Sequence, residues 1–378
     1  MSRHATFDGA PPEGTINLGV GQPSADLLPV DLLRGASGAF FAAAHPFDLN
    51  YGERQGDARF REQLARFLTR HYGSPTSAGE LLVTGGNSQA LGLVANVFAR
   101  PGATVLVEDP SYFLAFKILR DHGLNLVGVD MDDEGPCLKS LEVALAHHRP
   151  AFFYTIPSYQ NPTGICSSAE RRAAIVALAQ QYGTIIVADE PYQLLHYYDA
   201  PPPALGTMVD SGAVISLGSF SKILAPALRL GWLQASDALL ERISLDGVIN
   251  SGGALNHIGS HIARHALANG RLDAHIEGLR SAYRSRLEAM DSALQEHFSE
   301  LATWSTPAGG YFVWLRFDGS VDTASLKSAA LDLQTGFTPG PLCSPDGRGQ
   351  NCLRLSFAHY GEAAIRTAIA RLRRLFER

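Results

Sequence analysis

The sequence is poor in cysteine: only four of its 378 residues are cysteines, and no two of them form a CxxC pair. This scarcity argues against a disulfide framework or a cysteine-rich zinc cluster, and it suits a reducing compartment. The first residues lack the apolar core of a signal peptide. No apolar run approaches the roughly 20 residues that a membrane helix needs. We therefore expect a cytoplasmic protein that does not bind a membrane.

An excess of charge of one sign is also absent, because 31 lysines and arginines stand against 37 aspartates and glutamates, for a net charge of −6. Such a mild acidic balance gives no electrostatic basis for binding nucleic acid. The composition is otherwise that of an ordinary globular protein, and the chain is long enough for one large and one smaller domain.

Short apolar or β-branched runs alternate with helical segments from about residue 50 onward. The runs are continuous, as is typical of strands covered on both faces. This succession predicts an α/β fold with a mostly parallel sheet. The expected strands span 81–84, 104–107, 151–154, 184–187 and 213–216, and the expected helices include 57–70, 88–98 and 167–181.

The pattern changes after about residue 270. A long amphipathic helix over 271–298 leads to two strands and a terminal helix, which indicates a separate α+β unit. We expect an N-terminal arm (1–15), a small domain (16–45 and 275–378) and a large domain (46–274).

Distinctive polar residues follow the predicted strands. Ligands of open α/β sheets bind at the carboxyl ends of the strands, so a site is expected there. Five strand ends with such residues are more than a purely structural sheet requires. The segments are 86–88, 109–112, 158–162, 189–192 and 219–222.

Lys222 ends the run Ser219-Phe220-Ser221-Lys222, directly after a predicted strand. Lysines are normally exposed, and a buried lysine readily takes a lowered pKa, which a Schiff-base nucleophile needs. The alternative is a lysine at a helix start whose charged end reaches solvent.

Asp189 projects from the end of an apolar strand. A buried carboxylate needs a cationic or hydrogen-bonded partner. A protonated pyridine nitrogen would be such a partner, and its charge would make the ring an electron sink. The alternatives are a helix N-cap and a Mg²⁺ ligand.

The run Gly85-Gly86-Asn87-Ser88 opens a helix, where free N–H groups and the helix dipole favour an anion. It is neither a G-x-G-x-x-G fingerprint nor a Walker A loop. Arg229, seven residues past Lys222, could add a two-pronged phosphate contact. The alternatives are a simple turn with a cap and a surface arginine.

Taken together and in this order, these segments resemble the fold-type I enzymes that use pyridoxal 5'-phosphate (PLP), within the class I/II aminotransferase family. The resemblance extends from about Asn17 to the C-terminus. It is nearest to the 2-aminoadipate, kynurenine and broad-specificity aminotransferases, and the aminotransferase-like domain of certain bacterial transcription regulators is similar too. The matching stretches are Tyr51-Gly52, Thr84 to Leu91, Asp109-Pro110-Ser111-Tyr112, Gln160-Asn161-Pro162-Thr163-Gly164, Asp189-Glu190-Pro191-Tyr192, Ser219 to Pro226, Arg229-Leu230-Gly231 and Leu353-Arg354-Leu355-Ser356-Phe357.

The resemblance implies an aspartate-aminotransferase-like fold, with a seven-stranded sheet in a large PLP-binding domain. It also implies roles around the cofactor ring. Lys222 would bond to the cofactor as a Schiff base and carry the proton between the substrate Cα and the cofactor. Asp189 would pair with the ring nitrogen, Tyr112 would stack on the ring, and Asn161 and Tyr192 would bond its phenolic oxygen.

Further roles follow from the same resemblance. Arg354 would bind the substrate α-carboxylate, helped by Asn161, and Gly21 would lie beside the substrate. Tyr51 would reach the phosphate of a neighbouring subunit, which makes a homodimer the working unit. The remaining phosphate contacts would come from Gly86, Asn87, Ser88, Ser219 and Arg229.

We therefore expect an aminotransferase of amino-acid metabolism that moves an amino group between an L-amino acid and a 2-oxo acid by a ping-pong mechanism. One alternative is a PLP-dependent lyase or synthase on the same scaffold. Another is a PLP-binding sensor domain without turnover, which the absence of a DNA-binding region before the fold argues against. His261 and His265 are four residues apart but lack the carboxylate of H-E-x-x-H, so no metal site is expected.

Overall fold

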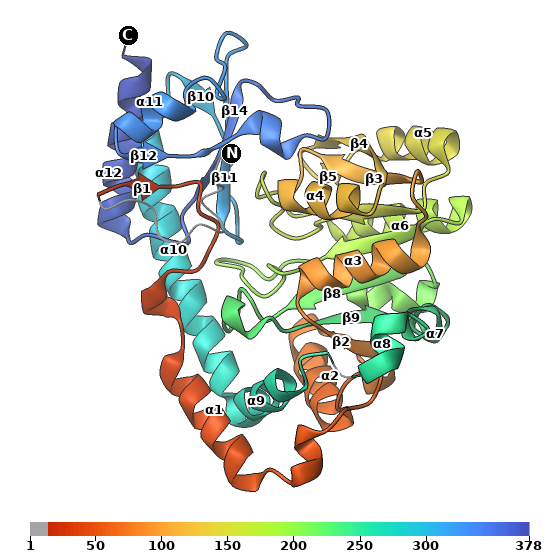
Figure 1. Cartoon of the computed structure of the whole chain (residues 1–378). Helices are drawn as coiled ribbons and strands as arrows, with labels where there is room; N and C mark the ends of the chain where they lie inside the picture. Colours follow the sequence, from red (N-terminus) through yellow and green to blue (C-terminus); the bar gives the residue numbers. More distant parts are fainter. Residues whose placement is uncertain (1–13, 254, 378) are drawn as a thin grey trace.

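The computed structural model describes residues 14–253 and 255–377. The expected arm of residues 1–15 therefore lies almost wholly outside the described residues. An eight-stranded sheet forms the middle of the larger part (Figure 1). Its strands, in spatial order, are β2 (Leu81–Thr84), β9 (Gly231–Ala235), β8 (Val214–Ser219), β7 (Ile185–Asp189), β6 (Phe152–Thr155), β3 (Thr104–Asp109), β4 (Asn125–Asp132) and β5 (Gly135–Pro136).

The sheet confirms the predicted α/β class with a mostly parallel sheet. Strands β8, β7, β6, β3 and β4 run parallel, whereas β9 is antiparallel to both β8 and β2. The eighth strand, β5, is two residues long and was not expected. It pairs antiparallel with β4 after a tight turn, and its first residue, Gly135, has a φ of +110°, a conformation that favours glycine.

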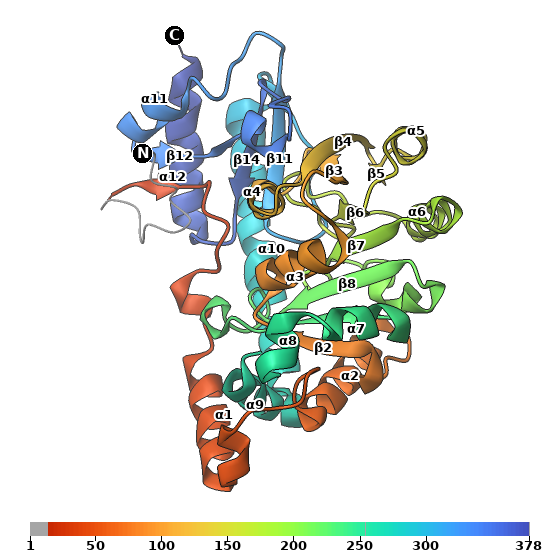
Figure 2. The same cartoon turned by 45° about the vertical axis from the view of Figure 1, so that its right-hand side comes forward.

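Helices cover both faces of this sheet, which explains the continuous apolar runs. In β3, Val105 and Val107 pack in a cluster with α3 and α4, whereas Leu106 between them packs in another cluster with α5 and α6. Figure 2 shows these helices on either side of the strands. They are α3 (Asn87–Phe98), α4 (Phe113–Asp121), α7 (Asp237–Ser244), α5 (Leu138–His148) and α6 (Ala169–Tyr182).

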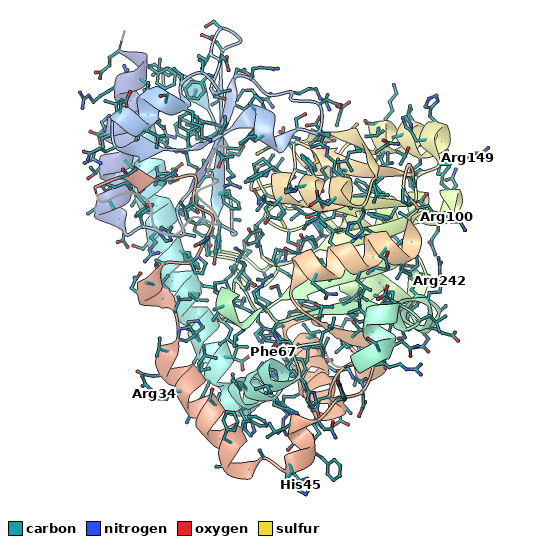
Figure 3. The ribbon with its side chains drawn as sticks, in the orientation of Figure 1. Arg34, His45, Phe67, Arg100, Arg149 and Arg242 are labelled. Atoms are coloured by element: carbon teal, nitrogen blue, oxygen red, sulfur yellow. The ribbon has the colours of Figure 1, made fainter. Side chains whose placement is uncertain are left out.

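The side chains follow the same division between inside and outside. Phe67, in α2 (Ala58–Tyr72), lies within the fold, whereas Arg100, Arg149 and Arg242 lie on its outer rim (Figure 3). Among the described residues, no helix combines the length and the apolar character that crossing a membrane requires.

A second, four-stranded antiparallel sheet belongs to the C-terminal part. We call this sheet and its helices the small lobe. Its strands are β10 (Ala302–Thr303), β11 (Phe312–Phe317), β14 (Cys352–Ser356) and β13 (Thr338–Pro339), and its helices are α11 (Lys327–Asp332) and α12 (Glu362–Arg373). Helix α10 (Arg271–Phe298) has the predicted bounds and runs from α9 (His257–Leu267) to this lobe (Figure 1).

The N-terminal segment contacts both parts. Strand β1 (Ile16–Asn17) pairs with β12 (Thr335–Gly336) in the small lobe, and α1 (Val30–Ala43) packs against α9. Since α10 also crosses the expected boundary at residue 275, the division into 16–45 with 275–378 and 46–274 stays a prediction.

A loop of the small lobe reaches the end of β3 in the large sheet (Figure 1). Arg348 donates from Nε to the buried carboxylate of Asp109 at 2.7 Å and from Nη1 to Asp130 at 2.9 Å. The backbone N–H of Ser111 donates to the carbonyl of Cys343 at 2.7 Å. These contacts fix the small lobe against the carboxyl ends of the strands.

Candidate active site

Lys222 lies in the loop between β8 and β9, where the sequence predicts it. Its Nζ donates to the carbonyl of Gly21 at 3.0 Å and lies 5.2 Å from the centre of the Tyr311 ring. The side chain borders a cavity but is otherwise enclosed by protein. Loss of hydration, reinforced by the positive charge of Arg354, lowers the pKa of Lys222 to about 8, against the opposing effect of Asp189. Lys222 therefore reaches a substantial fraction of neutral amine near pH 8, well below the pH that an exposed lysine requires.

Asp189 is the last residue of β7, and its carboxylate is buried. Oδ2 accepts a hydrogen bond from the Tyr154 hydroxyl at 2.7 Å, and Oδ1 accepts one from Asn87 Nδ2 at 2.5 Å. Burial raises the pKa of Asp189, and these two hydrogen bonds oppose the rise. No cation of the described residues forms a salt bridge with it. A protonated ring nitrogen fits this carboxylate, because it supplies the cation that burial otherwise lacks.

Gly86 stands at the N-cap of α3, and its φ of +89° favours glycine. A Cβ placed on Gly86 would come within 3.2 Å of the Arg229 guanidinium, so the glycine keeps the helix start open beside that cation. Asn256 holds the backbone of Arg229, because its Nδ2 donates to the Arg229 carbonyl at 2.6 Å. A helix N-terminus facing a guanidinium suits a phosphate group.

Arg354, in β14, is buried rather than exposed, because β11 and β13 flank its strand. Nη1 donates to Asn161 Oδ1 at 2.8 Å, and Nη2 donates to the carbonyl of Gly19 at 2.8 Å and to Thr338 Oγ1 at 3.0 Å. The guanidinium lies 4.1 Å from the centre of the Phe312 ring.

The charge of Arg354 is only partly compensated. Its Nε has no hydrogen-bond partner among residues 14–253 and 255–377, and burial lowers the pKa of its guanidinium. A carboxylate would supply both the missing acceptor and the missing charge.

A cavity of about 600 Å³ joins these groups, within the size range of small-molecule sites. Burial raises the pKa of Tyr112, on its wall, to about 12, so its hydroxyl stays protonated at neutral pH. The cavity brings together eleven residues that the sequence singles out: Gly21, Asn87, Ser88, Tyr112, Asn161, Asp189, Tyr192, Ser219, Lys222, Arg229 and Arg354.

Two further predicted residues do not line the cavity. Gly86 lies beside it, against Arg229. Tyr51 is far more open: 85% of its surface is exposed, and its ring lies near Gly252 at the edge of the molecule. Within one chain, Tyr51 is therefore not part of the cavity.

The sequence did not reveal the residues that fix the predicted site residues in position. Tyr154 anchors Asp189, yet in the sequence it is one more aromatic residue of a strand. Phe312 packs on Arg354, and the Gly19 carbonyl accepts from it. Nothing in the local pattern marks these contacts, because each joins segments far apart in the sequence.

The lowered pKa of Lys222 predicts its reactivity. Since the folded-state pKa is about 8 instead of 10.5, the free-amine fraction rises as the pH rises through about 8. We expect competitive acetylation of the cofactor-free protein, read by mass spectrometry of the Lys222 peptide, to give a midpoint near 8. The same peptide in the urea-unfolded protein should titrate near the ordinary value. A folded-state midpoint above 10 would contradict this electrostatic description of the site.

Comparisons with known proteins agree with the geometry. The family described as "Aminotransferase class I and II" matches residues 13–372. An aromatic-amino-acid aminotransferase of Thermococcus litoralis is 32% identical over 94% of this chain and 87% of its own. An HTH-type transcriptional regulator of Bacillus subtilis is 30% identical over 91% of this chain and 70% of its own.

A solved structure is equally similar. It is an alpha-aminoadipate aminotransferase of Thermus thermophilus, complexed with N-(5'-phosphopyridoxyl)-L-leucine. It superposes with a TM-score of 0.87 at 30% identity and covers 97% of this chain and 92% of its own. The expected fold and cofactor are thereby confirmed. The chain belongs to the class I and II aminotransferases and is a PLP-dependent enzyme of that family.

Proposed function

We propose that this aminotransferase exchanges the amino group of an L-amino acid with a 2-oxo acid in two half-reactions on one site. The observation that carries the proposal is the incompletely compensated guanidinium of Arg354, which borders the same cavity as Lys222. Both substrates carry a carboxylate next to the reacting carbon, and Arg354 suits that carboxylate in each half-reaction.

The cavity residues divide among three tasks. Asp189 would hold the ring nitrogen of PLP, and the start of α3 with Arg229 would hold its phosphate. When bound, PLP supplies an electron-withdrawing ring that stabilises negative charge on the substrate Cα. Lys222, with its lowered pKa, would take the proton from that carbon and return it. Tyr192 and Asn161 would orient the ring from the same wall.

The rest of the cavity wall suits an amino acid with an aromatic or long apolar side chain. The wall beyond Arg354 includes Phe113, Leu114 and Ile118, all from α4 or its start. Its one further lysine, Lys117, is already paired with Asp121 at 3.0 Å. Discrimination by such a wall is modest, about 1–3 kcal/mol per methylene. The name of the Thermococcus relative supports the same substrate class.

The first test follows the absorbance of the bound cofactor in the purified protein while amino acids are added. We expect phenylalanine, tyrosine and leucine to convert the spectrum with at least about tenfold higher efficiency than aspartate. The converted spectrum should return when 2-oxo acids are added. Release of ammonia or pyruvate without this reversal would favour a lyase, and a spectrum unchanged by every amino acid would favour a sensor.

Arg354→Lys tests the carboxylate site. A lysine cannot form the two-pronged contact, so we expect kcat/KM to fall by about 100-fold for every amino acid in the panel. Arg316→Lys is the matched control, because Arg316 lies on the neighbouring strand β11 with an exposed side chain. Equal effects of the two variants, or no effect of Arg354→Lys, would contradict the assigned role.

We also propose a homodimer in which Tyr51 completes the site of the partner subunit. The supporting observation is that large apolar side chains before Tyr51 in the chain, and one in α8 (Gly247–Gly252), whose last residue lies beside Tyr51, are between 58% and 75% exposed. His45 marks this end of the molecule in Figure 3, away from the small lobe. The exposed apolar residues are Phe41, Phe47, Leu49 and Val248. We place the dimer in the cytoplasm, in amino-acid metabolism, in keeping with its four unpaired cysteines.

Subunit mixing tests this arrangement. Tyr51→Ala and Lys222→Ala are each expected to leave their homodimers nearly inactive at limiting cofactor. A heterodimer of the two would have one intact site only if Tyr51 acts across the interface. After co-refolding, about half of the dimers are mixed, so activity should return to about one quarter of the wild-type value. No recovery, despite dimers in size-exclusion chromatography, would show that Tyr51 does not act in trans.

A further inference from the structure

Glu108 is a buried carboxylate that the proposed reaction leaves without a role. It is the residue before Asp109 in β3, and its surface is 0% exposed. Oε1 accepts hydrogen bonds from the backbone N–H of Ile156 at 3.0 Å and from the Thr155 hydroxyl. Oε2 accepts one from Gln160 Nε2 at 2.9 Å.

Burial disfavours the charged form of this carboxylate. Burial raises the pKa of Glu108 to about 7, although the hydrogen bonds of Thr155, Gln160 and Ile156 oppose the rise. A carboxylate is tolerated in such a place only where donors surround it. Three donors converging on two oxygens therefore indicate a built position for the side chain.

Gln160 extends the contact. Its Nε2 also donates to the carbonyl of Pro110 at 2.7 Å. Its Oε1 accepts from the backbone N–H of Thr163 at 2.9 Å and from the Thr163 hydroxyl at 2.8 Å. Every hydrogen-bonding position of the amide is thus used. One side chain joins the end of β3, the loop after β3 and the loop after β6.

The two joined loops carry groups that face the cavity. Pro110 lies two residues before Tyr112, and Gln160 directly precedes Asn161. Asn161 in turn accepts the hydrogen bond from Arg354. A shift of either loop would move a group on the cavity wall, and a displacement of about 1 Å can cost about 100-fold in rate.

We propose that Glu108 is a positioning residue that, through Gln160, holds the Tyr112 loop and the Asn161 loop at a fixed separation. This inference rests on the proposed roles of Tyr112 and Asn161 toward the cofactor. Glu108 itself does not line the cavity, so its effect is exerted through the two loops.

Thr335, in β12, provides a control for a purely structural role. It is also buried, and its hydroxyl donates to the carbonyl of Ala368 at 3.2 Å and to that of Ile16 at 3.4 Å. Neither Thr335 nor these two partners line the cavity, and the residues next to them in the chain do not line it either.

The test compares Glu108→Gln, Gln160→Met and Thr335→Val in stability, in cofactor affinity of the cofactor-free protein and in steady-state kinetics. All three should lower the urea midpoint. Only Glu108→Gln and Gln160→Met should weaken PLP binding about tenfold and reduce kcat/KM by about 10- to 100-fold. Because the two side chains share one contact, the double variant should be little worse than Gln160→Met alone.

Two results would overturn the proposal. One is that Glu108→Gln loses stability as Thr335→Val does but keeps wild-type PLP affinity and kcat/KM. The other is fully additive effects in the double variant. If Glu108→Gln does not fold, Gln160→Met decides, because Gln160 lies in a loop outside the sheet. A lack of effect of Tyr112→Ala and Asn161→Ala on PLP affinity would instead refute the cofactor roles, which separates the two failures.

Discussion

The active site depends on an excess of positive charge in one cavity. Three cations, Lys222, Arg229 and Arg354, face the single carboxylate of Asp189, whereas Lys117 and Asp121 neutralise each other at the cavity wall. Burial is the main cause of the lowered pKa of Lys222, and the charges of Arg354 and Arg229 lower it further against the opposing effect of Asp189. Such a cavity stabilises ligands that bring negative charge to the two arginines. A phosphate at Arg229 and a substrate carboxylate at Arg354 would supply this negative charge.

The fold creates this arrangement by ending its strands at one edge. Asp189 ends β7, and Lys222 follows β8. Tyr112 and Asn161 follow β3 and β6, so four strands deliver four groups to one edge. Arg354 arrives differently, on β14 of the small lobe. The substrate carboxylate would therefore join groups from the two parts of the molecule, as the contact between Arg348 and Asp109 also does.

The sequence predicted the residues that line this site but not the residues that hold them in place. Residues at strand ends could be predicted because strand position and residue type alone place them at the edge of the sheet. Tyr154, Phe312 and the Gly19 carbonyl could not, because they act on Asp189 and Arg354 through contacts between distant segments. In the fold, the parallel strands β3, β6, β7 and β8 followed from their apolar runs, and α10 followed from its amphipathic pattern. The parallel strand β4 and the antiparallel β9 were not singled out, and the two-residue strand β5 gave too short a pattern to detect.

The same distinction explains why Glu108 escaped sequence reasoning although it is adjacent to a recognised motif. Its neighbours Asp109 to Tyr112 belong to the resemblance, but the carboxylate itself points at Thr155, Ile156 and Gln160. A strand alternates its side chains between two faces, so neighbouring residues can serve different loops. Support and motif thus follow each other along β3: Glu108 lies four residues before Tyr112 of the cavity wall, and through Gln160 it holds the loop that carries Tyr112.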